Sequence, residues 1–483
     1  MLTHMLQARE RRRGRRITPV MIAGFLAGLL TVVCVLFGTT WVGARSITPG
    51  ELILLASVLA ILATLAWLIN SLRVGKRDWL APAGFPFLYM AFVYLVPAAY
   101  SIVTTRPLGL LQTSEVNGTT VTILTLSLAG TAVGMWLGSL GRVGGKQIHA
   151  QQTDWHRVGL VCRILLLIPL GFEVYWAVTI STYGTNQLSF DLSTTARVSV
   201  FTLQLTSTTG ICLANLRLGR RFPERLDSVL LGLTAAATLL SGTRFIVLSM
   251  VLVLLWASSR GGGGLKLSRL AGISIGIGGI FLSVLVMRSS TASPGLPGQS
   301  RTDLLLTDIS SPLLIVSRVA AVVPNQNSFE MGSTYLAGLK RQLPSPIADS
   351  LFGPPTDTGS YVYRKLTGYY ADNNGFGFAL PAEGYLNFGY VGALTSGILV
   401  GWLLSWSYRR SGLGRSGLAY PLLLATWPFL IRADFLTQTK GVLYPLITLA
   451  LVISASRTSE RSASQSRLTH VIQSDVAGRD SGR

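Results

Sequence analysis

Long apolar runs, separated mostly by short polar connections, make up most of this chain. Runs of about 20 apolar residues can cross a bilayer as helices, and the pattern predicts twelve such spans. The predicted spans are residues 17–41, 51–70, 79–103, 120–140, 158–180, 198–216, 226–240, 243–258, 268–287, 384–406, 416–431 and 439–455. The seventh and eighth spans are short, so one of them could be tilted, re-entrant or merged with its neighbour. We therefore expect an all-α polytopic membrane protein.

One long connection, residues 288–383, is the largest interruption in this pattern. It is mixed in composition and rich in Pro, Gly and Asn. The expected organisation is a basic N-terminus (1–16), nine spans (17–287), this connection (288–383), three spans (384–455) and a disordered tail (456–483). This asymmetric division differs from the matched halves of secondary transporters that are built from inverted repeats.

The net charge is strongly positive, with 41 Lys and Arg residues against 20 Asp and Glu residues. The basic residues punctuate the spans and are concentrated in alternate connections, which is typical of membrane topology and not of nucleic-acid binding. The positive-inside rule places both termini in the cytoplasm and residues 288–383 outside the cell membrane. We therefore expect a multi-pass protein whose partners include the lipid bilayer and exclude nucleic acid.

Histidine and cysteine offer little chemistry on the outer face. The four histidines, His4, His149, His156 and His470, all fall on the cytoplasmic side of the predicted topology. The three cysteines lie in apolar segments without metal-ligand spacing, as small core residues do. We expect neither a metal nor another cofactor.

Charged residues at the predicted outer ends of spans are the candidate functional groups. Arg244 lies in a Ser-Gly-Thr-Arg turn, where Ser241 or Thr243 could cap the following helix. A helix N-terminus beside an arginine is a physical site for an anion. The alternative is an Arg244 side chain that extends to the lipid headgroups.

Two further outer positions carry charge. Arg432 and Asp434 lie in the short connection before the last span, where they are either functional or a local ion pair. Glu173 lies in the outer half of the fifth span, where a carboxylate is costly unless it is paired or faces water. Functional and structural interpretations of Glu173 are both open.

The long connection contains its own candidates. The apolar segment 311–323 predicts a helix that lies on the membrane or packs on the bundle. Arg341 and Arg364 add cations, and the tyrosines around Arg364 suit either sugar rings beside phosphate or an interfacial belt.

Glu383 opens the tenth span, where the helix dipole favours its ionised form, so it is a candidate general base. Three nearby glycines would allow close approach of a backbone or a ligand: Gly377, Gly384 and Gly389.

The layout resembles a known family. The run Pro-Ala-Glu-Gly-Tyr-Leu-Asn-Phe-Gly-Tyr-Val-Gly at 381–392, the Ser-Gly-Thr-Arg turn at 241–244 and the single large outer connection are similar to O-antigen or oligosaccharide repeat-unit polymerases (Wzy-like). This resemblance covers roughly residues 226–455. Arg364 and Gly375 also match the spacing of an Arg-x10-Gly element of some members, although glycine is common in this chain.

The resemblance implies glycosyl transfer at the outer face of a bacterial plasma membrane. A saccharide chain on undecaprenyl diphosphate would move to the next lipid-linked repeat unit, with a flippase and a chain-length regulator as further partners. Arginines would stabilise the leaving diphosphate without a metal. The expected diphosphate-binding residues are Arg244, Arg432, Arg341 and Arg364. The expected bases are Glu383, then Asp372 and Glu173, and the expected sugar-binding residues are Tyr369, Tyr385 and Asn387.

Three other functions remain open at this point. A lipid-linked oligosaccharide flippase or another transporter would be expected to line a central cavity with charge at the bilayer midplane. An O-antigen ligase resembles the polymerases in layout, but the ligases are thought to use an outer histidine, which this predicted topology lacks. A structural protein of envelope assembly is the remaining alternative.

Overall fold

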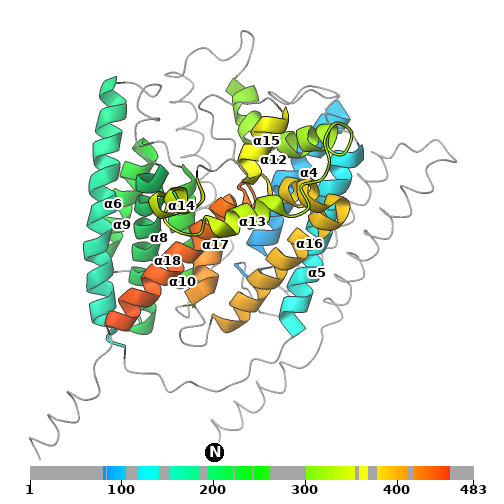
Figure 1. Cartoon of the computed structure of the whole chain (residues 1–483). Coiled ribbons are helices and arrows are strands. Elements are labelled where there is room, and N and C mark those ends of the chain that lie inside the picture. The colour runs from blue at the N-terminus through cyan, green and yellow to red at the C-terminus, as the bar shows by residue number, and fades with distance from the viewer. Residues whose placement is uncertain are drawn as a thin grey trace, which may run out of the picture.

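A computed structural model describes residues 80–82, 84–104, 118–140, 153–183, 194–220, 224–241, 244–260, 301–353, 358–367, 378–411 and 418–456. The elements in these ranges are α-helices that pack into one bundle (Figure 1). Three predicted spans, 17–41, 51–70 and 268–287, lie outside the described residues.

Helices occupy the positions of the other nine predicted spans. They are α4 (Phe85–Thr104), α5 (Gly118–Leu140), α6 (Trp155–Tyr183), α8 (Thr194–Arg217), α9 (Arg225–Leu240), α10 (Arg244–Ser258), α16 (Leu380–Arg410), α17 (Ala419–Leu430) and α18 (Phe435–Ala455). Among the described helices, four are long and apolar enough to cross a membrane, namely α5, α6, α16 and α18. The described part of the chain is therefore an all-α bundle of membrane-protein character, while the total of twelve spans stays a prediction.

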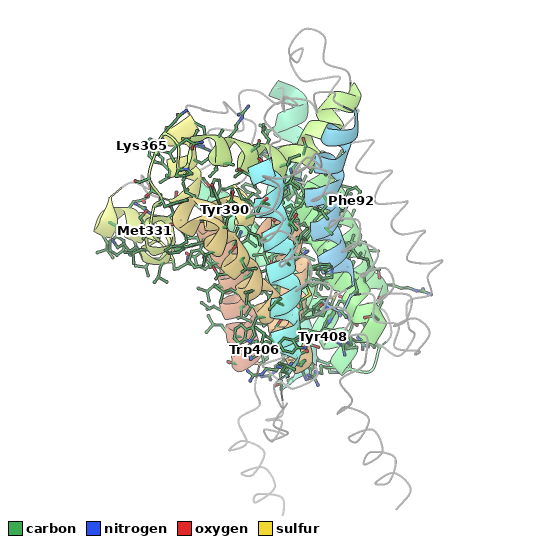
Figure 2. All side chains as sticks on the ribbon, turned by 90° about the vertical axis from the view of Figure 1, so that its right-hand side faces the viewer. Phe92, Met331, Lys365, Tyr390, Trp406 and Tyr408 are labelled. Carbon is green, nitrogen blue, oxygen red and sulfur yellow. The ribbon has the colours of Figure 1, made fainter. Side chains whose placement is uncertain are left out.

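Four further helices come from the long connection: α12 (Arg301–Val322), α13 (Ser333–Lys340), α14 (Ser345–Phe352) and α15 (Gly359–Thr367). Figure 2 shows Lys365 of α15 towards one end of the bundle and Trp406 and Tyr408 of α16 at the other. We call these the Lys365 end and the Trp406 end. The helix expected over 311–323 packs on the bundle, because Leu313 and Val316 are fully buried and α12 lies against α4, α5 and α16.

Close backbone contact between α5 and α16 holds the centre of one side of the bundle. A Cβ atom added at Gly134 or Gly401 would overlap a carbonyl oxygen of the facing helix. Small residues in the contact face let membrane helices approach until their backbones touch. The position of the long part of α16 follows from this contact.

A sharp turn divides α16 into two parts. Phe388 and Gly389 have non-helical backbone angles, and Gly389 has φ +62°, which favours glycine. Residues 380–387, the short arm, fold back so far that a Cβ added at Gly392 would overlap the carbonyl oxygen of Gly384. The predicted role of Gly384 in close backbone approach is confirmed, whereas Gly389 meets only the side chain of Phe329 and serves the turn through its positive φ. Gly377 lies outside the described residues. The single span expected from 384 is wrong at its start, because the chain turns here.

Candidate functional site

Glu383 lies on the short arm and is 1% exposed. Its Oε1 accepts a hydrogen bond from the Thr334 hydroxyl at 3.0 Å, and its Oε2 accepts one from the backbone N–H of Phe435 at 2.6 Å. Phe435 is the first residue of α18, so the carboxylate lies at the N-terminus of that helix. The positive end of the helix dipole and the free N–H groups there stabilise a negative charge.

Asp434 occupies the same helix end. It is 3% exposed and caps α18, because its Oδ1 accepts from the backbone N–H of Thr437 at 2.9 Å. Its Oδ2 accepts from the hydroxyl of Ser360 at 2.6 Å and from the N–H of Ser360 at 3.4 Å. Ser360 is the second residue of α15, so two helix N-termini meet at this pair of buried carboxylates.

The end of the short arm is held by hydrogen bonds that share Thr334 with Glu383. Asn387 donates from Nδ2 to the Thr334 hydroxyl at 2.7 Å, and its Oδ1 accepts from the N–H of Gly332 at 3.0 Å. The N–H groups of Glu330 and Met331 donate to the carbonyl oxygens of Leu386 and Asn387 at 3.0 and 3.1 Å. The carbonyls at the end of a helix need such partners, so the turn 330–332 fixes where the short arm ends.

Helices α13 and α15 cover Glu383. A Cβ atom added at Gly359, the first residue of α15, would lie 2.8 Å from Glu383 Oε1. The ring of Tyr335 on α13 packs edge-on against Phe435, with centroids 5.4 Å apart. Burial, together with the nearby Glu383 carboxylate, raises the pKa of Tyr335 above its usual value. The Tyr335 hydroxyl therefore stays protonated at neutral pH.

Arg432 adds a cation two residues before Asp434. Its Nη2 donates to the Ser311 hydroxyl at 2.5 Å, and its guanidinium lies 4.8 Å from the centroid of the Phe245 ring. Phe245 follows Arg244 at the start of α10, so two predicted diphosphate-binding positions are neighbours. The side chain of Arg244 lies outside the described residues. No ion pair joins Arg432 to Asp434 in the described residues, and the Asp434 oxygens accept hydrogen bonds from Ser360 and Thr437.

Glu173 meets the turn that precedes α10. It is buried on α6, and the Ser241 hydroxyl is its hydrogen-bond partner. Ser241 itself ends α9, with its hydroxyl donating to the Thr238 carbonyl at 2.9 Å. The Ser241 hydroxyl thus turns back along α9, while its expected role as the cap of the following helix stays a prediction, because residues 242–243 lie outside the described residues. Thr243, the other expected cap, lies outside the described residues.

Other predicted residues are held by protein contacts elsewhere. The Arg341 side chain, 5% exposed, pairs with Asp349 at 2.7 Å and ties α13 to α14. The Tyr385 hydroxyl donates to the Val323 carbonyl at 3.3 Å within the core, and Arg364 is exposed on α15. A phosphate role for Arg341 would require it to leave Asp349. Two further candidates lie outside the described residues, and they are Tyr369 and Asp372.

Sequence reasoning missed the hydroxyl groups that hold the carboxylates. Thr334, Ser360 and Ser311 come from three helices of the long connection and bond to Glu383, Asp434 and Arg432, respectively. The only local signal is a Gly-Ser pair next to Thr334 and another at Ser360, where short helices begin. Their partners are remote in the sequence, so the pattern alone does not reveal the contacts.

The site combines two buried carboxylates, an arginine and several hydroxyls without a metal-binding cluster in the described ranges. Such a set can accept a proton and stabilise a negative charge. No protein-family model, no curated protein and no solved structure matches the chain.

Proposed function

We propose that the protein is a membrane glycosyltransferase that polymerises oligosaccharide repeat units linked to undecaprenyl diphosphate. The observation that supports this proposal is convergence at one site. Glu383, Arg432 and the start of α10 belong to three separate predicted outer segments, yet they are linked through Phe435 and Phe245. A carboxylate base next to a cation is the arrangement that glycosyl transfer to a hydroxyl with a diphosphate leaving group requires.

In the proposed reaction, a hydroxyl oxygen of the acceptor sugar attacks the anomeric carbon of the donor. The bond from that carbon to the diphosphate oxygen breaks, and the diphosphate leaves with the bonding electrons. Glu383 accepts the hydroxyl proton, while Arg432 and Arg244 stabilise the charge on the diphosphate. Because Gly359 lies directly over Glu383, α15 has to shift before the acceptor can reach the carboxylate.

The proposed orientation places the Lys365 end outside the cell. The Trp406 end carries the last residues of α8 and α16, including Arg217, Arg409 and Arg410, and basic residues mark the cytoplasmic side. We place the protein in the bacterial plasma membrane with both termini inside. Its proposed partners are the lipid-linked oligosaccharide, a flippase and a chain-length regulator.

The test is a deletion strain that carries wild type, Arg432→Ala or Glu383→Gln on a plasmid. We expect single lipid-linked repeat units to accumulate on the outer face in the deletion strain, and polymer to return only with the wild type. Arg410→Ala, at the opposite end of the bundle, is the matched control and should restore polymer. Normal polymer with Glu383→Gln would remove Glu383 as the base, and unchanged glycans after deletion would refute the polymerase.

A flippase or another transporter is the second candidate function, and one observation favours it. Helix α8 is rich in Thr and Ser, yet it is buried among other helices, and a polar buried helix suits a pathway for solutes. Lipid-linked units trapped on the cytoplasmic face of the deletion strain would support this function. A ligase mechanism with an outer histidine receives no such support. His156, the one histidine in the described ranges, lies at the start of α6, next to the end of α18, whereas Glu383 meets the start of α18.

A further inference from the structure

Helix α8 is polar where a membrane bundle is usually apolar. Residues 204–215 are all buried, and Thr206, Ser207, Thr208 and Thr209 are completely so. Among the described helices of at least 18 residues, α8 is not apolar enough to count as a membrane span. Its polar surface therefore faces other helices, where a hydroxyl or amide needs a partner.

One face of α8 points at α9. Gln204 donates from Nε2 to the Thr238 hydroxyl at 2.8 Å, and Asn215 donates from Nδ2 to Asp227 Oδ2 at 2.7 Å. Thr208 is one helical turn from Gln204 in the direction of Asn215, so it lies on the same face. We call Gln204, Thr208 and Thr238 the α8 seam.

The seam continues to the Lys365 end through hydrogen bonds. Thr238 is followed one turn later by Ser241, whose hydroxyl donates to the Thr238 carbonyl at 2.9 Å. Ser241 is in turn the hydrogen-bond partner of Glu173 on α6. A run of buried polar groups thus leads from the carboxylate of Glu173 to Thr208, in the interior of the bundle.

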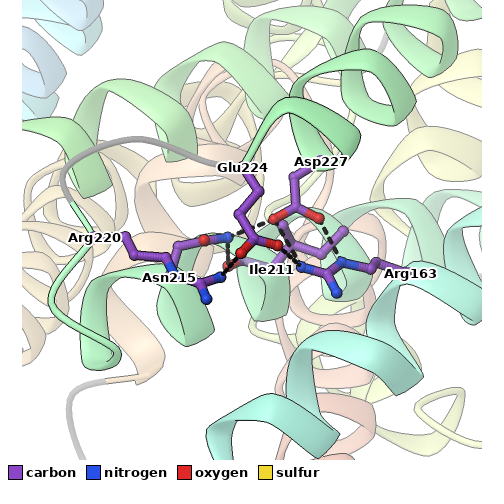
Figure 3. Close-up of polar contacts among 6 residues, drawn as sticks. All are labelled: Arg163, Ile211, Asn215, Arg220, Glu224 and Asp227. Atoms are coloured by element: carbon purple, nitrogen blue, oxygen red, sulfur yellow. Dashed lines mark hydrogen bonds and ion pairs between the residues drawn. The ribbon is translucent and has the colours of Figure 1, made fainter.

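A cluster of ion pairs lies beyond the other end of the seam. Figure 3 shows Arg163 donating from Nε to Asp227 Oδ1 at 2.6 Å and from Nη2 to Glu224 Oε2 at 2.9 Å, with Asn215 beside them. Glu224 also pairs with Arg220. Between this cluster and Thr208, both Ile211 and Leu231 are buried and apolar.

Several polar atoms of α8 are buried and have no hydrogen-bond partner within the described part of the protein. On the seam they are Gln204 Oε1 and Thr208 Oγ1, and Ser207 Oγ lies beside them. Buried polar atoms in folded proteins almost always have a partner, and water is the usual one when protein atoms are absent. Water can both donate to the amide oxygen and bond to the hydroxyls, so it suits all three groups.

We infer that the α8 seam is a water-filled half-channel, which opens towards the Lys365 end and ends at the layer of Ile211 and Leu231. The water bonds to Gln204 Oε1 and to the hydroxyls of Ser207 and Thr208. This inference does not rest on the proposed function, because a polymerase and a transporter could both contain such a seam.

Two methionines of the native chain provide a matched probe. Met250 borders the α8 seam, because its sulfur accepts a hydrogen bond from Gln204 Nε2 at 3.2 Å. Its side chain is 1% exposed. Met90 is 0% exposed on α4, with its sulfur accepting from the Thr131 hydroxyl at 3.7 Å. Both sulfurs are buried next to a polar group, so bulk solvent reaches neither.

The experiment is hydroxyl-radical footprinting by radiolysis of the intact protein in lipid nanodiscs prepared in ¹⁸O-labelled water. Radicals formed from water on the seam should convert Met250 to the ¹⁸O sulfoxide at least about tenfold faster than Met90. Equal rates at the two methionines would overturn the inference.

A variant then tests where the water binds. Gln204→Leu removes the amide oxygen, and we expect the oxidation rate of Met250 to fall to that of Met90. Thr208→Val is a milder variant with the same expectation, should Gln204→Leu fail to accumulate in the membrane. An unchanged Met250 rate in a folded variant would place the water elsewhere and contradict the proposed seam.

Discussion

At the scale of single residues, Glu383 depends on groups that come from different helices. Thr334 and Phe435 donate the two hydrogen bonds to its carboxylate. The Thr334 hydroxyl also accepts a hydrogen bond from the side-chain amide of Asn387. Glu383 could be singled out from the sequence, because it is a carboxylate beside the predicted start of a span. Its partners could not, because hydroxyls are common and only the packing of α13 against α16 and α18 selects Thr334.

Replacing Thr334 tests this network. Thr334→Val leaves the amide of Asn387 without one buried acceptor and removes one donor from Glu383. We expect the free energy of unfolding to fall by about 1–3 kcal/mol, the cost of leaving a buried polar group without its partner. Denaturant unfolding in detergent would measure the change. Thr334→Ser keeps the hydroxyl and should lose much less, so equal losses in the two variants would contradict the role of the hydrogen bonds.

At the scale of elements, helix positions could be predicted far better than helix contacts. The nine described helices at predicted spans follow from apolar runs, and α5 and α6 begin and end within about three residues of the prediction. The start of α16 could not be predicted, because its fold-back depends on Gly389 and on a partner turn at 330–332. The apolar pattern of 311–323 predicted a helix on the membrane or on the bundle, but it did not reveal that the partners of α12 are α4, α5 and α16.

Two arginines on α6 provide an internal comparison of ion pairs. Arg163 joins α6 to Asp227 of α9, whose side chain is 0% exposed, whereas the Arg157–Asp154 pair is largely exposed. Arg163→Met leaves a buried carboxylate without its cation, so we expect a loss of about 3–5 kcal/mol in the free energy of unfolding. Arg157→Met should cost at most about 1 kcal/mol. Thermal and denaturant unfolding of both variants would measure the difference, and similar losses would contradict the structural role of Arg163.

Glycines in two helices should respond to alanine in opposite ways. A Cβ at Gly401 would overlap the Thr131 carbonyl, whereas nothing lies within 4 Å of a Cβ at Gly232 on α9. Gly232→Ala should therefore stabilise the protein by about 0.5–1 kcal/mol, because alanine loses less backbone entropy in a helix. Gly401→Ala should lower the melting temperature by forcing α5 and α16 apart. A stabilising Gly401→Ala would show that these helices do not touch.

At the scale of the whole molecule, the separation of charged groups defines two ends. The carboxylate pair and Arg432 gather near helices from the long connection, whereas the arginines that close α8 and α16 lie at the Trp406 end. The alternation of basic residues predicts which of these ends lies in the cytoplasm, and that orientation stays a prediction. The convergence of α10, α16 and α18 at one site was not predictable, because it arises from three-dimensional packing.

Labelling of single cysteines would test the orientation. In a protein without its native cysteines, Lys365→Cys should react with a membrane-impermeant thiol reagent added to intact cells. Arg410→Cys should react only after the cells are permeabilised. Both side chains are exposed, so exposure is matched and only the side of the membrane differs. The reverse pattern would invert the topology and place the carboxylate pair in the cytoplasm.

The bond from Phe435 to Glu383 also has a consequence for the order of synthesis. A chain grows from its N-terminus, so Glu383 leaves the ribosome before the residue whose N–H completes its surroundings. Thr334, Asn387 and Glu383 can assemble early, but the carboxylate stays without its second partner until α18 begins. A nascent protein therefore cannot close this site until nearly all of its helices exist, and a chain that ends before Phe435 keeps it open.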